Sequence, residues 1–226
     1  MTIRTDSFAL TPKRYSPVAQ YALRGRGAEL YPDRSGNGLH LSQSFSPACG
    51  PDGYPDTCLH AGKVASAALV PLQILGDLTV TVRACALYNG ARQFLYNEND
   101  GTAVASPYCL LVEPDGTIKV ACESSTQNDY VYATTLLAKW GRWAVYSIRR
   151  DVAGGRWTVG LNKTYQTSGP MTVTVPLNGT QPKLYAGGPD VGPQLWAGFS
   201  ADLSIWDQRL TDAQVSGIVD AMGIVP

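Results

Sequence analysis

Stretches in which β-branched and aromatic residues alternate with polar ones follow one another along most of the chain. Such residues favour extended backbone, because their branched or flat side chains pack well on a pleated surface. The pattern predicts strands at 78–88, 107–113, 117–123, 130–137, 142–150, 156–162, 171–175 and 196–206. Most neighbouring segments have centres about ten to fifteen residues apart, with turn residues between them. This spacing is typical of an antiparallel β-sandwich.

Turn signals separate these segments. Glu113–Gly116 has the sequence EPDG, in which proline suits the first central position of a turn and glycine lies where the chain reverses. Asp151–Gly155 connects the next pair of strands in the same way. The run Asp33–Leu41 (DRSGNGLHL) predicts a third tight turn, because Gly36 and Gly38 can adopt positive φ and its polar side chains can bond nearby backbone N–H groups.

One helix is predicted, near the end of the chain. Thr211 suits the N-cap position, and Gln214 three residues later completes a capping box. Leu210 and Val215 lie at the positions of a hydrophobic staple, and Gly223 provides a left-handed stop. The apolar residues of one helical face are Val215, Ile218, Val219 and Met222. We therefore expect a short amphipathic helix that packs on the sandwich.

The length of 226 residues suffices for one large domain or two small ones. All-β sandwiches of this size commonly form a single domain, and the sequence has no internal repeat. We therefore predict a single domain over residues 18–226. Residues 1–17, which contain Pro12 and Pro17, are predicted to form an extended arm.

Charge and hydropathy narrow the expected partners. Lys and Arg together number 18, as do Asp and Glu, and no dense basic block occurs. The sequence therefore lacks the electrostatic pattern of a protein that binds nucleic acid or an anionic membrane. The first residues lack the apolar region of a secretory signal, and no run approaches 18 apolar residues. We expect synthesis in a host cytoplasm, with neither export signal nor membrane span.

Five cysteines, at positions 49, 58, 85, 109 and 122, are an odd number, which argues against a fully paired disulfide framework. Most are expected to be reduced. Cys49 and Cys58 bracket one loop and could close it under oxidising conditions. Cys109 and Cys122 are predicted to lie near each other across a hairpin, which leaves a second pairing open.

Three segments carry a family resemblance: PDRSGNGLHL, KWGRWAVYSIRRDVAGGRWTVGLN and LYAGGPDVGPQLWAGFSADLSIWDQRLTDAQV. Together they resemble the laminin G-like, concanavalin A-like jelly rolls, a group that includes pentraxins and legume-type lectins. The resemblance covers the chain from about Tyr15 to Met222. It implies an all-β fold, a two-sheet antiparallel jelly-roll sandwich with one short C-terminal helix. The residues that match family core positions are Trp143, Gly198, Leu203, Ile205, Trp206 and Leu210.

Catalytic signatures are missing from the sequence. Related glucanases carry an E-x-D-x-E strand with paired carboxylates. The nearest match here, Glu98–Thr102 (ENDGT), lacks the second glutamate and is predicted to be a loop. Glutamate occurs only at positions 29, 98, 113 and 123. No G-x-S-x-G, H-E-x-x-H or Walker motif occurs either. We therefore predict that the chain is not an enzyme, with a glycoside hydrolase as the least favoured alternative.

Calcium is the metal that the resemblance implies, because many relatives bind it at a loop rim through oxygen ligands. The candidate ligands are Asp33, Asn37, Asp190 and Asp202. No other cofactor is expected. The same residues are also typical turn formers and caps, and both interpretations stay open at this point.

Aromatic residues at strand ends or in loops are candidates for stacking on sugar rings. The candidates are Tyr88, Tyr96, Tyr130, Tyr185 and Trp196. Tyrosine and tryptophan also fill sandwich cores with their polar tips at the rim, so packing is the competing interpretation for each of them.

The sequence favours a non-catalytic structural or binding module. The arm, the near-neutral charge and the missing export signal resemble a virion protein of a tailed bacteriophage, such as a capsid decoration protein, head fibre or tail adhesin. The expected partners are capsid or tail proteins and cell-surface glycan, and the expected assembly is a homo-oligomer, a trimer being the favoured form. The alternative is a free carbohydrate-binding lectin, for which calcium dependence stays open.

Overall fold

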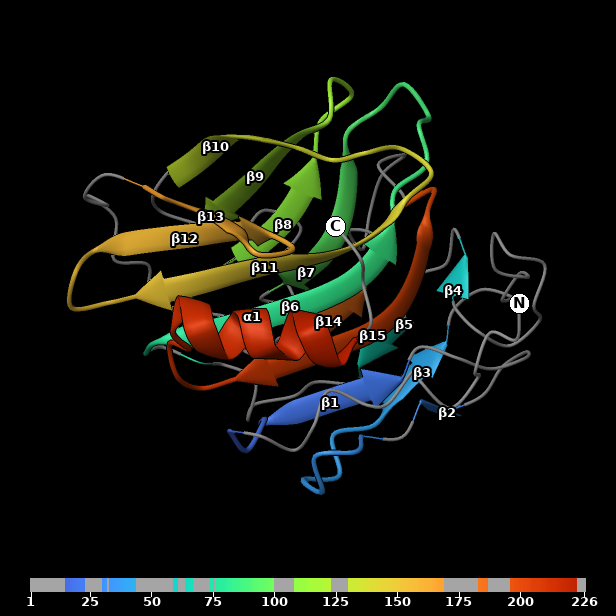
Figure 1. Ribbon diagram of the computed structural model, residues 1–226. Coiled ribbons are helices and arrows are strands. Elements are labelled where there is room, and N and C mark those ends of the chain that lie inside the picture. Colours follow the sequence, from blue (N-terminus) through green and yellow to red (C-terminus); the bar gives the residue numbers. More distant parts are fainter. Residues whose placement is uncertain are drawn as a thin grey trace.

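The computed structural model describes residues 15–22, 30–31, 33–43, 59–60, 64–66, 74, 76–99, 108–122, 130–168, 183–186 and 196–222. Its strands form two antiparallel sheets that face each other, and one helix lies against the outer face of the first sheet (Figure 1). The antiparallel sandwich with one C-terminal helix that the sequence predicts is therefore confirmed.

The seven-stranded sheet carries the helix. Its strand order is β1-β15-β6-β11-β12-β13, and β4 also pairs with β15. The bounds are β1 Ala19–Ala22, β4 Leu59–His60, β6 Leu78–Cys85, β11 Trp143–Asp151, β12 Arg156–Leu161, β13 Thr164–Thr167 and β15 Phe199–Trp206. The central strands β15, β6 and β11 are the longest and most buried, so they form the rigid base of the fold.

The eight-stranded sheet has the order β10-β9-β8-β7-β14-β5-β3-β2. The bounds are β2 Leu30–Tyr31, β3 Leu41–Gln43, β5 Val64–Ser66, β7 Gln93–Asn99, β8 Tyr108–Val112, β9 Thr117–Cys122, β10 Tyr130–Leu137 and β14 Lys183–Ala186. Strands β7 to β10 follow one another as a meander, whereas β14 enters from far along the chain.

The core fills the space between the two sheets. Successive side chains of a strand point to opposite faces, and in β6 the inward-facing residues Leu78, Val80, Val82 and Ala84 are all 0% exposed. They pack with apolar side chains from β11, β12, β15 and the eight-stranded sheet. Because register fixes which face each residue occupies, this alternation also determines where the polar residues of the same strands lie.

The helix α1, Asp212–Ala221, has the predicted capping box. Gln214 N donates to Thr211 Oγ1 at 3.3 Å, and Thr211 N donates to Gln214 Oε1 at 2.8 Å. The apolar face of α1 packs on Trp206 and Val145 of the outer sheet face. Among the described residues no helix is long and apolar enough to cross a membrane.

The predicted strands that lie within the described residues are confirmed within a few residues. The segment 78–88 ends as a strand at Cys85, and residues 86–92 form a loop. Strands β1, β2, β4, β5, β7, β13 and β14 are not among the predicted strands, and the end of β7 contains Glu98 and Asn99 of the segment expected to be a loop. Pairing with β8 on one side and β14 on the other outweighs the low strand preference of these polar residues. The predicted strand 171–175, the predicted stop at Gly223 and the arm before Tyr15 lie outside the described residues.

The two cysteines expected to face each other across a hairpin are one residue out of register. Cys109 pairs with Ala121, and Cys122 pairs with Tyr130. The backbone register therefore does not set the two cysteines opposite each other, and the side chain of Cys122 lies outside the described part of the structure. Cys85 and Cys109 are both buried. Burial raises the pKa of the Cys85 thiol to about 11, which makes it a poor nucleophile at neutral pH.

Candidate functional site

Three loops meet at one end of the sandwich, which we call the Tyr88 end: Ala86–Arg92, Glu113–Thr117 and Ala138–Arg142. Gly141 N donates to Ala86 O at 2.7 Å, and Ala138 N donates to Gly116 O at 2.8 Å. Arg92 Nε donates to Glu113 Oε1 at 3.0 Å. These bonds tie the loops to one another in a closed triangle, so the side chains that they carry are held on a well-defined surface.

Two aromatic rings lie together on this surface. Tyr88 is 66% exposed, the highest value among the large hydrophobic residues of the described chain. Its ring meets that of Trp140 edge to face, with centroids 5.6 Å apart and planes at 75°. Trp140 also packs partly against the core. This geometry is a favourable one for aromatic pairs, and it leaves most of the tyrosine ring open to solvent.

The loop that carries Tyr88 is supported from beneath by Gln93, which is 0% exposed. Its Nε2 donates to Leu87 O at 2.8 Å, and its Oε1 accepts from Ala197 N at 2.9 Å. Asn89 Oδ1 accepts from Ala91 N at 3.0 Å, closing a local turn. A buried side chain with both ends bonded restrains the backbone next to Tyr88, so the ring is presented from a fixed position.

Charged groups flank the aromatic pair. Glu113 forms ion pairs with Arg92 at 2.7 Å and with Lys119 at 2.8 Å. Burial alone would raise the pKa of the Glu113 carboxyl, but the hydrogen bonds and charges of Arg92 and Lys119 outweigh it and lower the pKa. Arg92 keeps 45% of its side chain exposed. The surface thus combines an apolar ring with donors and acceptors, the mixture found in small-molecule sites.

The other predicted stacking residues lie elsewhere. Tyr96 and Trp196 are 1% and 0% exposed and belong to the core between the sheets. Their rings offer no face to a ligand, because neighbouring side chains enclose them. This corrects the expectation for both residues, and the competing interpretation as packing residues describes them. Tyr130 begins β10 and Tyr185 lies in β14, but their side chains lie outside the described part of the structure.

The turn at Asp33–Leu41 is organised around Asp33, which is 8% exposed. Its Oδ1 accepts from Gln20 N at 3.0 Å and from Ser35 N at 2.9 Å. Its Oδ2 accepts from Ser35 Oγ at 2.7 Å and from Leu39 N at 3.1 Å. Burial alone would raise the pKa of this carboxyl, but these hydrogen bonds outweigh it and hold the pKa below its usual range. The carboxylate therefore acts as a structural hub.

The candidate calcium ligands do not fit a common calcium site. The four acceptor positions of Asp33 are all taken by protein donors. Asn37 Nδ2 donates to Val18 O at 2.8 Å. Asp202 lies on the outer face of β15 and forms an ion pair with Arg83 at 3.9 Å. Asp190 lies outside the described residues, and within them no group of three or more His, Cys, Asp or Glu side chains is close enough to hold a metal.

Two further predictions fall outside the described residues. One concerns Cys49 and Cys58, the predicted disulfide pair. The other concerns the ENDGT segment, of which Asp100, Gly101 and Thr102 are not described. The remaining glutamate with a described side chain, Glu113, is fully engaged by Arg92 and Lys119.

No family model matches the chain, and no curated protein matches it either. Solved structures do show a similar fold. A mutant of Trypanosoma rangeli sialidase displaying trans-sialidase activity has a TM-score of 0.68 at 11% identity, covering 95% of this chain and 35% of that chain. The binding domain of botulinum neurotoxin DC in complex with rat synaptotagmin II has a TM-score of 0.67 at 10% identity, covering 92% and 52%.

A third similar structure is closer to this chain in size. The Ruminococcus gnavus IT-sialidase CBM40 bound to alpha2,3 sialyllactose has a TM-score of 0.58 at 11% identity, covering 69% of this chain and 92% of that chain. At this level of identity the likeness shows the fold alone, and the fold is a jelly-roll β-sandwich. The chain spans about a third of the sialidase and half of the toxin domain. The resemblance to laminin G-like domains stays a prediction.

Sequence reasoning selected Tyr88 but missed the residues around it. Trp140 lies in a turn, between Lys139 and Gly141, and a tryptophan beside a turn glycine is the signal that could have found it. Gln93 and Arg92 carry no local signal, because their roles come from contacts with distant segments.

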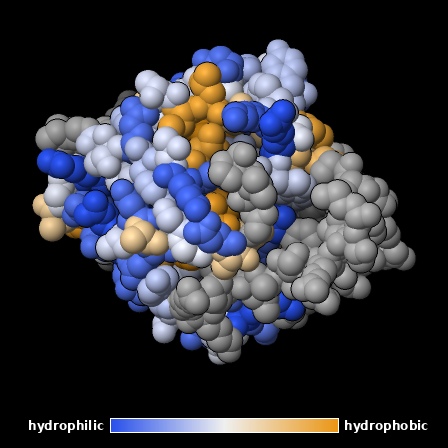
Figure 2. Space-filling model, in the orientation of Figure 1, coloured by the Kyte–Doolittle hydropathy of each residue, from blue (hydrophilic) through white to orange (hydrophobic). Residues whose placement is uncertain are grey.

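The space-filling view shows a mainly hydrophilic surface with narrow apolar areas (Figure 2).

Proposed function

We propose that this chain is a non-catalytic glycan-binding module whose ligand stacks on Tyr88 at the Tyr88 end. The observation that carries the proposal is the exposed Tyr88 ring, held edge to face against Trp140 on a surface of three bonded loops. An exposed aromatic ring on a rigid base loses little conformational entropy when a ligand covers it. Flanking polar groups would orient the hydroxyl groups of a sugar.

The similar structures support a binding role. The Ruminococcus gnavus domain was solved bound to alpha2,3 sialyllactose, and a binding domain of botulinum neurotoxin DC was solved in complex with SialylT. Both share the jelly-roll fold with this chain, and fold alone does not determine function. The proposal therefore rests on the Tyr88 surface first and on these neighbours second.

A glycan array tests the proposal with the wild-type protein and three variants. Tyr88→Ala removes the stacking ring, and we expect it to weaken binding about tenfold or more. Trp140→Ala removes the supporting ring and should also weaken binding. The matched control is Tyr15→Ala, because Tyr15 is also exposed (36%) but lies next to Gln208 at the opposite end of the sandwich. An array without signal for the wild type, or equal losses in Tyr88→Ala and Tyr15→Ala, would refute the proposal.

The biological setting that we propose is attachment of a tailed-phage virion to its host cell. Its support is the sequence resemblance and the predicted arm over residues 1–17. Capsid or tail proteins would be the partners, with the domain assembled as a trimer. Deleting residues 1–17 should abolish association with particles while glycan binding by the domain persists. Unchanged association after the deletion would contradict the role of the arm.

A further inference from the structure

Arg92, at the Tyr88 end, uses only one edge of its guanidinium within the protein. Its Nε and Nη2 lie 3.0 and 2.7 Å from a single acceptor, Glu113 Oε1. A guanidinium carries five N–H donors in a planar fork, so the edge formed by Nη1 and the second hydrogen of Nη2 has donors to spare. No residue in the described part of the chain accepts from Nη1. Because 45% of the Arg92 side chain is exposed, a ligand can reach it from solvent.

The carboxylate of Glu113 fixes the guanidinium without neutralising its surroundings. The same oxygen, Oε1, also accepts from Lys119 Nζ at 2.8 Å, so one negative charge is shared between two positive ones. Two bonds from one guanidinium to one carboxylate restrict the plane in which the arginine fork lies. Arg92 is thus preorganised, and it loses little side-chain entropy when a second acceptor binds to its other edge.

The surface around Arg92 is positively charged, although the chain as a whole is neutral. Over the full sequence, 18 Lys and Arg residues balance 18 Asp and Glu residues. The three loops of the Tyr88 end and the adjoining Lys119 carry more cations than carboxylates: Arg92, Lys119, Lys139 and Arg142 against Glu113 and Asp115. Lys139 and Arg142 are exposed, on either side of Trp140 in the sequence. An excess of positive charge on one surface attracts anions.

Tyr88 and Arg92 lie close enough for one ligand to contact both. Four residues separate them, which limits the distance between their Cα atoms to about 14 Å. The turn closed by the bond from Ala91 N to Asn89 Oδ1 shortens this path. A Cβ at Gly90 would lie 3.9 Å from Tyr88 Oη, so the hydroxyl end of the ring lies beside the middle of the loop. A short oligosaccharide on the ring therefore reaches the guanidinium.

We propose that the Tyr88 end selects glycans that carry a carboxylate, and that the free edge of Arg92 binds this carboxylate. The inference rests on the proposed glycan-binding function, to which it adds the class of ligand and the residue that selects it. A carboxylate matches the planar fork of arginine with two parallel hydrogen bonds, while a sugar ring covers Tyr88. A neutral glycan covers the same ring but leaves the free edge of Arg92 in water, so it binds more weakly.

Titration calorimetry of the full chain measures this preference. The probes are trigalacturonate and alpha2,3 sialyllactose, and each is compared with its own primary amide, which keeps the size of the sugar but has no charge. We expect at least one acid to bind about tenfold more tightly than its amide. This advantage should shrink as salt is added, because the pairing takes place at the surface.

Three variants locate the preference. Arg92→Gln combined with Glu113→Gln removes one charge of each sign, so the net charge is unchanged, and the preference should fall to about twofold or less. Arg92→Lys keeps the charge but not the planar fork, and it should lose most of the preference while part of the salt dependence remains. Both variants exchange side chains of the surface, so the Tm should change little.

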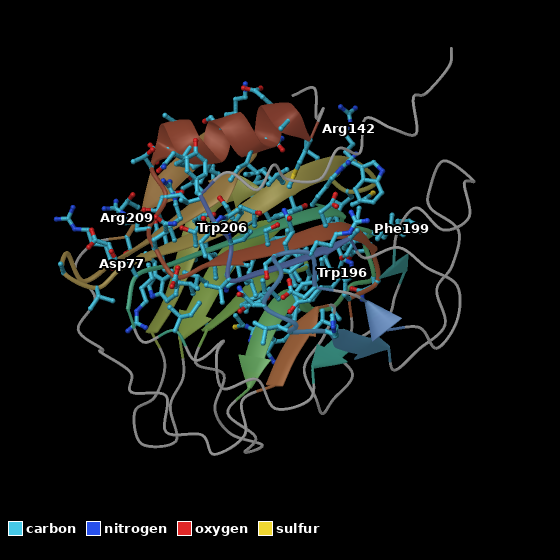
Figure 3. All side chains as sticks on the ribbon, turned by 90° about the horizontal axis from the view of Figure 1, so that it is seen from below. Asp77, Arg142, Trp196, Phe199, Trp206 and Arg209 are labelled. Carbon is cyan, nitrogen blue, oxygen red and sulfur yellow. The ribbon has the colours of Figure 1, made fainter. Side chains whose placement is uncertain are left out.

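The control is Arg209→Gln at the opposite end of the sandwich. Arg209 is also a half-exposed arginine (41%) that pairs with a carboxylate, since its Nη1 donates to Asp151 Oδ2 at 2.9 Å. Figure 3 shows Arg209 at one end of the molecule and Arg142 of the Tyr88 end at the other. Because this variant removes a positive charge away from the ligand, it should keep the full preference.

Two results would overturn the inference and leave the proposed function in place. One is a wild type that binds each acid and its amide equally, and the other is a tenfold preference that persists in the double variant, in both cases with binding that Tyr88→Ala still weakens. A wild type that binds no acid, no amide and no glycan of the array would overturn the proposed function, and this inference with it.

Discussion

The turns 33–40 and 86–92 each contain a glycine with nearly the same backbone angle: φ is 73° at Gly38 and 74° at Gly90. Both turns combine glycine with asparagine, and both connect to strands of the sandwich. In the first turn, the carboxylate of Asp33 accepts four hydrogen bonds from protein groups. In the second turn, Tyr88 is 66% exposed, and its ring faces solvent.

The difference separates a turn that is bonded throughout within the fold from the turn at which we propose binding. The polar groups of the first turn are used up inside the protein, so that turn fixes a corner of the fold. The second turn is held from below by Gln93, so the ring of Tyr88 stays available. Polar and aromatic groups that the fold itself neither bonds nor buries therefore mark a candidate functional surface.

Asp33→Ala should produce the largest effect. It leaves the buried amides of Gln20 and Leu39 without acceptors, and we expect a loss of about 3 kcal/mol of unfolding free energy. For a domain of this size this corresponds to a fall of about 9 °C in Tm. Urea and thermal unfolding measure the loss, and ligand affinity per folded molecule should stay unchanged.

The control is Asp115→Ala, in the turn between β8 and β9. Asp115 Oδ1 accepts from Thr117 N at 2.8 Å, but this residue is fully exposed to solvent. Water replaces the lost acceptor there, so the loss of stability should be much smaller than for Asp33→Ala. Similar losses in both variants would show that Asp33 is not the hub of its turn.

The pH dependence of stability provides the next test. The pKa of Asp33 is lowered from its ordinary value of 3.8, so the folded state favours the ionised form more than the unfolded state does. The stabilisation is then complete above about pH 4 to 5, and it is lost as the pH falls through the lower folded-state pKa. Unfolding measured between pH 7 and pH 2 should show the difference between wild type and Asp33→Ala shrinking with acid. A constant difference would contradict the assignment.

The sequence predicts the sheets well where one face of a strand is buried and alternation is strong. Strand β6 is an example, since every second residue from Leu78 to Ala84 lies in the core. The sequence pattern does not predict β7. The polar end of this strand is held by pairing with β14, which lies more than 80 residues further along the chain. Pairing between distant segments leaves no local pattern in the sequence, so such strands have to be found in the structure.

The candidate site was predicted in part. Tyr88, Tyr96 and Trp196 are candidates for the same reason, a predicted place at a strand end or in a loop, but Tyr96 and Trp196 are buried. A bulge in β7 between Phe94 and Tyr96 turns Tyr96 toward the core. Exposure of an aromatic residue depends on such shifts of register, which a single sequence does not reveal.

Matched glycine substitutions test the two turns directly. An added Cβ at Gly38 meets no atom within 4 Å, and at Gly90 it lies 3.9 Å from Tyr88 Oη. Alanine at positive φ costs about 1 kcal/mol, so Gly38→Ala and Gly90→Ala should lose similar stability. Gly90→Ala alone should also weaken glycan binding, by about threefold, because its methyl group lies beside the ring. Equal affinities in both variants would separate the second turn from ligand binding.

The smallest expected effect concerns the charge next to the ring. Glu113→Gln breaks the ion pairs with Arg92 and Lys119, which should cost about 0.5 kcal/mol of stability because such pairs near the surface contribute little. The freed cations should tighten binding of acidic glycans about twofold, leave neutral glycans unchanged, and lose this effect at high salt. Asp151→Asn, which breaks the pair with Arg209 at the opposite end, should lower stability without changing affinity. A gain in Asp151→Asn equal to that in Glu113→Gln would mean that the whole molecule's charge, and not the Tyr88 end, attracts the ligand.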